Sequence, residues 1–177
     1  MIETIAIIFS LLSVYYSIKK NFFTWIWGII GIIFYAIFFY NEKLYSNLLL
    51  QFIFLSQSIH GIISWKTNNK EGLIVKKMRD YEIFISAQAV LLIFVILSVF
   101  NNSILDNITS SISIVALFLL SIRRLENWFF WIVADIIYIY MFYQSSNYQS
   151  SILYTVFLIM CVVGYKKWKN ALSKNKK

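Results

Sequence analysis

Residues 127–144 read NWFFWIVADIIYIYMFYQ, an apolar run with the length of a membrane-spanning helix and one acidic residue, Asp135, near its centre. A helix needs about 20 mostly apolar residues to cross a bilayer, whereas a barrel strand needs only about 9–11 of alternating polarity. The run therefore predicts a membrane helix. A carboxylate at the bilayer centre is costly and usually faces a cavity or a partner. Asp135 is thus a candidate for a substrate or ion path; the alternative is a structural hydrogen bond to a neighbouring helix.

Similar apolar runs fill most of the remaining chain. They lie at 3–18, 23–41, 46–65, 81–100, 104–122 and 149–167. Of the 177 residues, 60% are hydrophobic and 14% are charged, against about 45–50% and about 25% in soluble domains. This composition excludes a soluble enzyme of ordinary design and a disordered chain. It predicts an all-α polytopic membrane protein with seven transmembrane helices.

The basic residues predict the orientation of these helices. If the helices alternate in direction, 15 of the 16 Lys and Arg residues follow the first, third, fifth and seventh runs, and Lys43 alone lies on the other side. Loops rich in Lys and Arg stay in the cytoplasm. The amino terminus is therefore expected outside and the carboxyl terminus inside. No nucleic-acid partner is expected, because no folded basic surface is left to bind one.

An internal repeat divides the chain. A shift of 103 residues lays 25–65 on 128–168 and matches 12 identical pairs in 41 positions. The informative pairs are Trp25 and Trp128, Tyr35 and Tyr138, Gly61 and Gly164, and Trp65 and Trp168. An offset of four helices preserves direction, so the predicted arrangement is a 3+1+3 parallel repeat, an architecture of transporters. The expected segments are a three-helix unit at 1–65, a cytoplasmic linker and connecting helix at 66–103, a second unit at 104–168, and a basic cytoplasmic tail at 169–177.

Four side chains share one face of the run around Asp135. Trp128, Trp131, Asp135 and Tyr138 follow the i, i+3, i+7, i+10 spacing of a helical face. Aromatic rings attract a cation through their faces, and a carboxylate supplies the counter-charge, so the pattern predicts a site for a flat organic cation. An interfacial aromatic belt would explain Trp128 but not Asp135.

The run at 46–65 carries four polar side chains: Asn47, Gln51, Gln57 and His60. Amides at membrane depth bridge helices or contact a ligand, and Gln51 is the strongest candidate for the site. His60 has no companions at metal-ligand spacing, so no metal is expected and a packing or hydrogen-bonding role is favoured. Tyr35 joins the candidates as the repeat partner of Tyr138.

The sequence contains no phosphate-binding glycine loop, catalytic triad or ligand cluster, so neither an enzyme nor a cofactor is expected. Asp135 and His60 are the only acidic or basic residues deep in a run, and a proton pump usually needs a relay of several. We therefore expect an energy-independent carrier with a midplane cavity between the two units. The alternative of a different class is a non-transporting membrane scaffold without such a cavity, in which protein neighbours satisfy Asp135 and Gln51.

Two stretches resemble the PnuC-type family of vitamin-precursor transporters. They are TWIWGIIGIIFYAIFFYNEKLYSNLLLQFIF from residue 24 with HGIISW at 60–65, and ENWFFWIVADIIYIYMFY from residue 126 with SSILYTVFLIMCVVGYKKW at 150–168. The most specific elements are Trp-x-x-Trp at 128–131, Asp-x-x-Tyr at 135–138, Leu-Gln at 50–51 and two Gly-x-x-x-Trp endings. The sequence departs from the family at Asp135, where nicotinamide riboside carriers often have Asn, at Ile26, where the family has Pro, and at His60, where many members have Tyr.

The resemblance implies a seven-helix 3+1+3 fold similar to the SWEET sugar carriers, assembly as a homotrimer and a location in a bacterial inner membrane. It also implies facilitated diffusion of a vitamin precursor that a cytoplasmic kinase traps by phosphorylation. Family substrates are nicotinamide riboside and, in other branches, thiamine or riboflavin. Nicotinamide riboside and thiamine carry a fixed positive ring that fits Asp135, whereas riboflavin is neutral and fits less well. Nicotinamide riboside is the expected substrate, and thiamine is the alternative.

Overall fold

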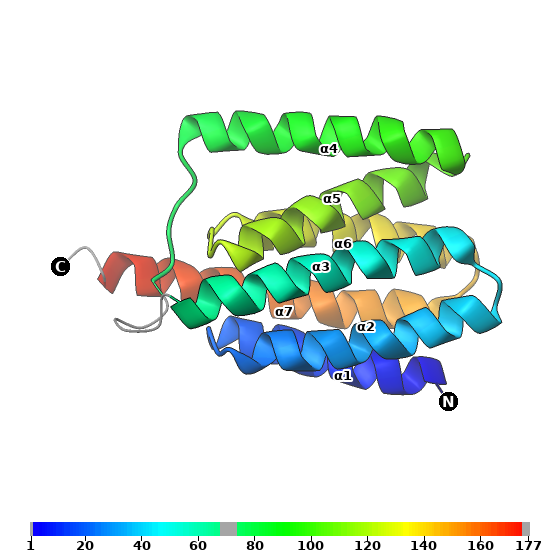
Figure 1. The fold of residues 1–177 in the computed structure, drawn as a ribbon, viewed down its shortest axis with the longest axis horizontal. Helices are drawn as coiled ribbons and strands as arrows, with labels where there is room; N and C mark the ends of the chain where they lie inside the picture. Colours follow the sequence, from blue (N-terminus) through cyan, green and yellow to red (C-terminus); the bar gives the residue numbers. More distant parts are fainter. Residues whose placement is uncertain (1, 68–73, 175–177) are drawn as a thin grey trace.

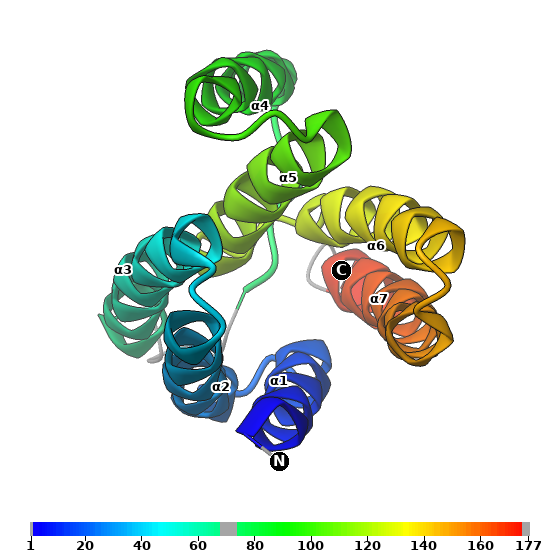
Figure 2. The ribbon, with the colours of Figure 1, turned by 90° about the vertical axis from the view of Figure 1, so that its right-hand side faces the viewer.

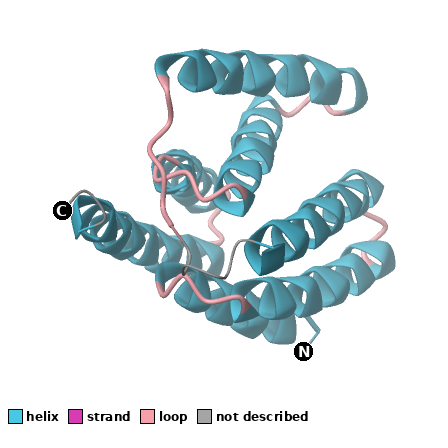
Figure 3. Cartoon of the chain, turned by 60° about the vertical axis from the view of Figure 1, so that its left-hand side comes forward, coloured by secondary structure: helices cyan, strands magenta, loops and turns pink. Residues whose placement is uncertain are grey.

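The computed structural model describes residues 2–67 and 74–174, which form seven α-helices joined by loops (Figures 1 and 3). The helices are α1 (Ile2–Ile18), α2 (Phe23–Asn41), α3 (Tyr45–Thr67), α4 (Asp80–Phe100), α5 (Ile104–Ser121), α6 (Asn127–Gln144) and α7 (Tyr148–Lys174). Within the described residues, the β pairing is limited to an isolated bridge between Lys76 and Arg124. The predicted all-helical fold with seven helices is therefore confirmed.

The helix ends lie within about two residues of the predicted runs, with one exception. α7 does not end at residue 167 but continues to Lys174, so the first part of the predicted basic tail is helical. Basic side chains near a helix carboxyl terminus interact favourably with its dipole, which accounts for this extension. Residues 68–73 of the predicted linker and 175–177 of the predicted tail lie outside the described residues.

Five helices, α2, α3, α4, α5 and α7, are each long and apolar enough to cross a membrane. α1 is apolar but has only 17 residues, which extend about 25 Å at the usual helical rise. α6 contains Asp135 and ends in polar residues, which lower its mean hydropathy. Both nevertheless lie alongside the other helices in the bundle (Figure 1).

Six of the helices are arranged in a ring, and α4 stands outside it (Figure 2). α1 packs on α2 and α2 on α3, and α5, α6 and α7 repeat this order. The two sets of three meet where α3 packs on α5 and where α7 packs on α1. α4 packs chiefly on α5, and Ser86 is its one buried residue. Its apolar side chains are therefore available to lipid.

The two sets of three helices repeat the same tryptophan packing. Trp25 of α2 meets Trp65 of α3 edge to face, with ring centroids 5.3 Å apart. Trp128 of α6 meets Trp168 of α7 in the same way at 5.5 Å. The two pairs are 103 residues apart, so the repeat found in the sequence corresponds to equivalent contacts in the structure.

A glycine makes each of these close contacts possible. A Cβ atom on Gly164 of α7 would lie 2.6 Å from ring atoms of Trp128, and one on Gly61 of α3 would overlap the ring of Trp25 in the same way. Carbon atoms do not approach so closely without displacement of the ring or the helix. Only glycine therefore fits at these two positions.

The turns repeat as well. Within the described part of the chain, the residues other than glycine with a positive φ are Lys20 at 56°, Lys43 at 59°, Arg123 at 61° and Ser146 at 58°. They form two pairs with a spacing of 103 residues, and each follows the end of a helix. Such left-handed positions are typical of helix carboxyl termini and uncommon for residues with a side chain. The backbone of the two sets is therefore alike in its turns as well as in its helices.

The segment that leads into α4 is attached to the turn between α5 and α6. Lys76 forms the isolated bridge with Arg124, and the Met78 amide donates a hydrogen bond of 2.9 Å to Glu126 Oε2. Arg124 also forms a salt bridge with Glu82 in the first turn of α4. These contacts hold the start of α4 against the second set of helices.

Candidate functional site

A cavity of about 900 Å³ is lined by side chains from all six helices of the ring. Leu97 and Phe100 of α4 add to its lining at one edge. The volume falls in the range of about 300–1,000 Å³ that is usual for small-molecule sites. The cavity can therefore accommodate a ligand the size of a nucleoside.

The cavity is open at the end of the molecule that holds the amino terminus. Lining residues there are exposed, among them Glu3, Asn147 and Tyr45, whose exposed fraction is 62%. At the opposite end the lining stops at Trp25 and Trp128, which are each 2% exposed. A ligand can therefore reach the interior from one end in this conformation.

The closed end consists of a tryptophan cluster, formed by Trp25, Trp65, Trp128 and Trp168. Trp65 and Trp168 meet at its middle, with ring centroids 6.4 Å apart. The Trp65 Nε1–H donates to the carbonyl oxygen of Ser121 in α5, and the Trp168 Nε1–H donates to that of Ser17 in α1, each at 3.1 Å. Both bonds connect one set of three helices to the other.

Asp135 lies on the wall of this cavity and is only 4% exposed. Its side chain contacts the thiol of Cys161 in α7, while its Oδ2 atom has no hydrogen-bond partner among the described residues. The part of the lining that the structure describes contains no Lys, Arg or His. An unpaired buried carboxylate is unfavourable, so a ligand that brings positive charge or a hydrogen-bond donor would be stabilised here.

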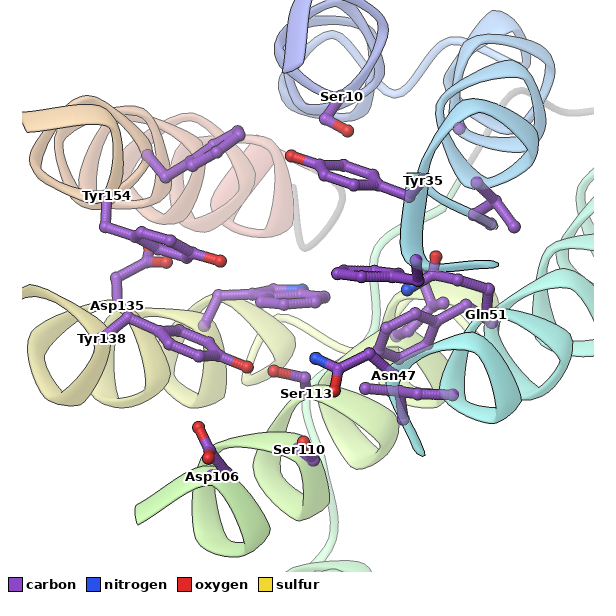
Figure 4. A pocket seen from close by; sticks show the side chains of 18 of the residues that line it. Ser10, Tyr35, Asn47, Gln51, Asp106, Ser110, Ser113, Asp135, Tyr138 and Tyr154 are labelled. Carbon is purple, nitrogen blue, oxygen red and sulfur yellow. The ribbon is translucent and has the colours of Figure 1, made fainter. Parts of the chain in front are cut away.

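Aromatic rings lie beside Asp135 (Figure 4). Tyr138 stacks on Tyr154 of α7, with centroids 4.5 Å apart and planes at 27°, and Phe142 lies 5.4 Å from Tyr154. Trp131 lies one turn before Asp135 and also lines the cavity. This wall offers ring faces to a flat ligand next to the carboxylate.

The opposite wall is formed by α2 and α3. Tyr35 of α2 and the buried Gln51 of α3 lie across the cavity from Asp135, and Asn47 lies nearer the open end (Figure 4). The structure thus brings together seven of the nine predicted residues in one cavity: Asn47, Gln51, Tyr35, Trp128, Trp131, Asp135 and Tyr138.

Gln57 and His60, the other two predicted residues, do not line the cavity. Gln57 Nε2 donates to the Ile114 carbonyl at 3.1 Å, and His60 Nδ1 lies 3.0 Å from Ser121 Oγ. They follow Gln51 by six and nine residues, which at about 100° per residue turns both toward α5. Their role is to connect α3 to α5, as the hydrogen-bonding interpretation of His60 predicts.

Other lining residues were not among the sequence candidates. Tyr154 is the repeat partner of Gln51, so the shift of 103 residues contained the signal for it. Ser110 and Ser113 of α5 lie near the hydroxyl of Tyr138 (Figure 4). Serines in an apolar run carry no sequence signal of their own. Among the described residues, no group of three or more His, Cys, Asp or Glu could hold a metal ion.

Comparison with known proteins identifies the family. Residues 1–170 match the family model described as "Nicotinamide mononucleotide transporter". The chain belongs to this nicotinamide mononucleotide transporter family. The match covers nearly the whole chain, so it includes both sets of helices and every cavity residue named above.

Curated relatives agree with this assignment. This family member is 22% identical over 204 residues to the nicotinamide riboside transporter PnuC of Escherichia coli (strain K12). The match covers 96% of this chain and 85% of the relative. It is 24% identical over 195 residues to the nicotinamide riboside transporter PnuC of Neisseria mucosa, covering 98% of this chain and 74% of the relative.

A solved structure shares the fold of this family member. The crystal structure of the vitamin B3 transporter PnuC matches with a TM-score of 0.81 and 20% sequence identity, covering 98% of this chain and 82% of that chain. At this identity the likeness establishes the fold. Family membership and fold together make the chain a membrane transporter.

Proposed function

We propose that this transporter mediates facilitated uptake of nicotinamide riboside across the bacterial inner membrane. The observation that carries the proposal is Asp135, a buried carboxylate with an unpartnered oxygen on the wall of an open cavity. Nicotinamide riboside has a flat, positively charged ring, which stacking aromatic side chains and a carboxylate can hold together. The curated relatives carry the same substrate in their names.

The lining supports the riboside over the corresponding mononucleotide. The mononucleotide adds a phosphate group, which proteins usually bind with Arg, Lys or helix amino termini. Among residues 2–67 and 74–174, those that line the cavity include no Lys or Arg but three acidic residues, namely Glu3, Asp106 and Asp135. A phosphate dianion would therefore enter a negative field without a counter-charge.

Thiamine is the second candidate, because its cationic ring fits the same carboxylate. Riboflavin is neutral and would form no ion pair with Asp135. The scaffold alternative expects no central cavity and a carboxylate satisfied by protein neighbours, and both expectations disagree with the site.

The charges on the chain support an orientation in which the cavity faces outward. Basic residues gather at the closed end, in the turns at Lys19 and Lys20 and at Arg123 and Arg124, whereas Lys43 lies in the turn between α2 and α3 at the open end. By the positive-inside rule the open end faces out. Substrate then enters from outside, and the tryptophan cluster must separate for release into the cytoplasm.

A downhill carrier does not retain its substrate, so we propose that a cytoplasmic kinase phosphorylates the riboside and makes uptake one-way. The homotrimer implied by the family resemblance stays a prediction.

Uptake by liposomes that contain the purified protein tests the function. We expect saturable uptake of labelled nicotinamide riboside that stops at equal inside and outside concentrations, with no uptake of the mononucleotide. Unlabelled thiamine, added as a competitor, separates the two cationic candidates. Uptake of the mononucleotide at a similar rate, or accumulation driven by a pH or sodium gradient alone, would contradict the proposal.

A further inference from the structure

Two acidic side chains stand at the open end of the cavity. Glu3 lies in the first turn of α1 and Asp106 in the first turn of α5, and both line the cavity. They are 103 residues apart, so they occupy equivalent positions in the two sets of helices. Glu3 lies near Tyr35. Asp106 lies near Tyr138, the repeat partner of Tyr35 (Figure 4).

Helix stability explains only part of this arrangement. An acidic residue in the first turn stabilises a helix by about 0.3–1 kcal/mol through the helix dipole. The dipole favours an acid at any position in the first turn. It does not explain why the acid lines the cavity in both sets of helices. Asp135 lies in the same cavity, 4% exposed and with Oδ2 unpartnered, and the lining contains no basic residue. The whole path from the open end to the site is therefore negative.

We propose that Glu3 and Asp106 form an acidic rim that draws organic cations into the cavity and repels anions before they reach Asp135. The rim thus takes part in selecting the riboside over phosphorylated forms. The inference rests on the proposed function for the identity of the cation, but charge selection at the rim is testable without it.

The rim and Asp135 act at different stages. Charges near a cavity mouth change the rate of entry, and added salt screens them because the Debye length is only about 10 Å at 0.1 M. Asp135 is buried on the cavity wall, where a charge would change chiefly the rate at which a bound ligand dissociates. A rim effect is therefore recognised by its dependence on ionic strength.

Cys161 provides a built-in probe for this test. It is the only cysteine of the chain and lines the cavity beside Asp135. We propose to measure its rates of modification by a positively charged and a negatively charged methanethiosulfonate of similar size. In Glu3→Gln/Asp106→Asn, the ratio of cation to anion rates should fall about 3- to 10-fold at low salt, and by less in concentrated salt. The intrinsic reactivity of the thiol cancels in the comparison of the two proteins.

The ratio is also measured in Glu3→Gln and in Asp106→Asn separately, and Glu42→Gln is the matched control, because each of the three variants removes one acidic charge. Glu42 is an exposed acid in the turn between α2 and α3, at the same end of the molecule, and does not line the cavity. Its replacement removes one charge and should leave the ratio of rates within about 1.5-fold of the original, because Glu42 is exposed to water outside the cavity lining and its charge is screened more strongly than that of a lining residue. Thermal unfolding of each variant measures the helix-dipole contribution separately.

If Cys161 reacts with neither reagent, the same ratio is measured at Ser110→Cys combined with Cys161→Ser. Ser110 lies one turn after Asp106 and lines the cavity closer to the open end. An unchanged ratio in the rim variant, or an equal change in Glu42→Gln, overturns the rim. A reduced, salt-dependent ratio supports it even if the liposomes take up no riboside, whereas riboside uptake with an unchanged ratio rejects the rim alone.

Discussion

Asp135→Asn should weaken the binding of nicotinamide riboside about 5- to 30-fold while leaving the fold intact. Asparagine keeps the shape and much of the hydrogen bonding of aspartate, so the substitution removes mainly the charge. Removing one partner of a buried charge pair typically costs about 2–5 kcal/mol. A cavity open to water screens the pair, so we expect about 1–2 kcal/mol, which corresponds to the stated change in affinity.

Binding isotherms with two ligands on both proteins measure this effect. The second ligand is a neutral analogue of the riboside that lacks the ring charge, and its affinity should change by less than about 2-fold, because it makes no ion pair. Equal weakening of both ligands would mean that Asp135 acts through hydrogen bonding or structure. Asparagine stands at this position in many carriers of the resembling family, so the variant should retain transport at high substrate concentration.

Gly164→Ala should destabilise the protein by about 1–3 kcal/mol, because the added methyl group has no room. Its Cβ would lie 2.6 Å from ring atoms of Trp128. That ring is itself held edge to face by Trp168 and is 2% exposed, so it cannot move aside without disturbing the tryptophan cluster. The midpoint of thermal unfolding should fall by roughly 3–10 °C.

Gly31→Ala is the matched control for this experiment. Its Cβ would meet the hydroxyl of Ser10 at 3.1 Å, a contact that rotation of one small side chain relieves. Alanine also favours a helix by up to about 1 kcal/mol over glycine, so little net change is expected.

Trp128→Phe should restore part of the stability lost in Gly164→Ala. Additive losses in the double variant would show that the ring is not the cause.

The helices were predictable from the sequence because a bilayer fixes their length and polarity. The predicted run at 127–144 has the same first and last residues as α6, because polar residues mark both of its ends. The same reasoning could not foresee that α7 continues to Lys174, because a water-exposed helix beyond the membrane carries no apolar signal. The spacing of 103 residues between Trp25 and Trp128 indicated that the two tryptophans occupy equivalent positions. That the tryptophan cluster closes one end of the cavity depends on the three-dimensional packing and could not be predicted.

The site was predictable where it follows a single helical face. Trp131, Asp135 and Tyr138 are spaced so that α6 alone directs them to one side, and the structure places them together. The location of Gln57 and His60 away from the cavity could not be predicted, because polarity at membrane depth does not reveal which neighbour a side chain faces. Here the neighbour is α5, whose carbonyl and hydroxyl groups accommodate them.

The two indole hydrogen bonds at the closed end have a consequence for how that end can open. The two sets of helices meet at two seams, one between α3 and α5 and the other between α7 and α1. Trp65 donates to α5 at the first seam and Trp168 donates to α1 at the second, so each set supplies the donor at one seam and the acceptor at the other. Opening either seam alone would leave a buried N–H without a partner, at a cost of about 1–3 kcal/mol, while the second seam still held the sets together. The two seams are therefore expected to part in one cooperative step, which keeps partially opened, leaky forms of the carrier rare.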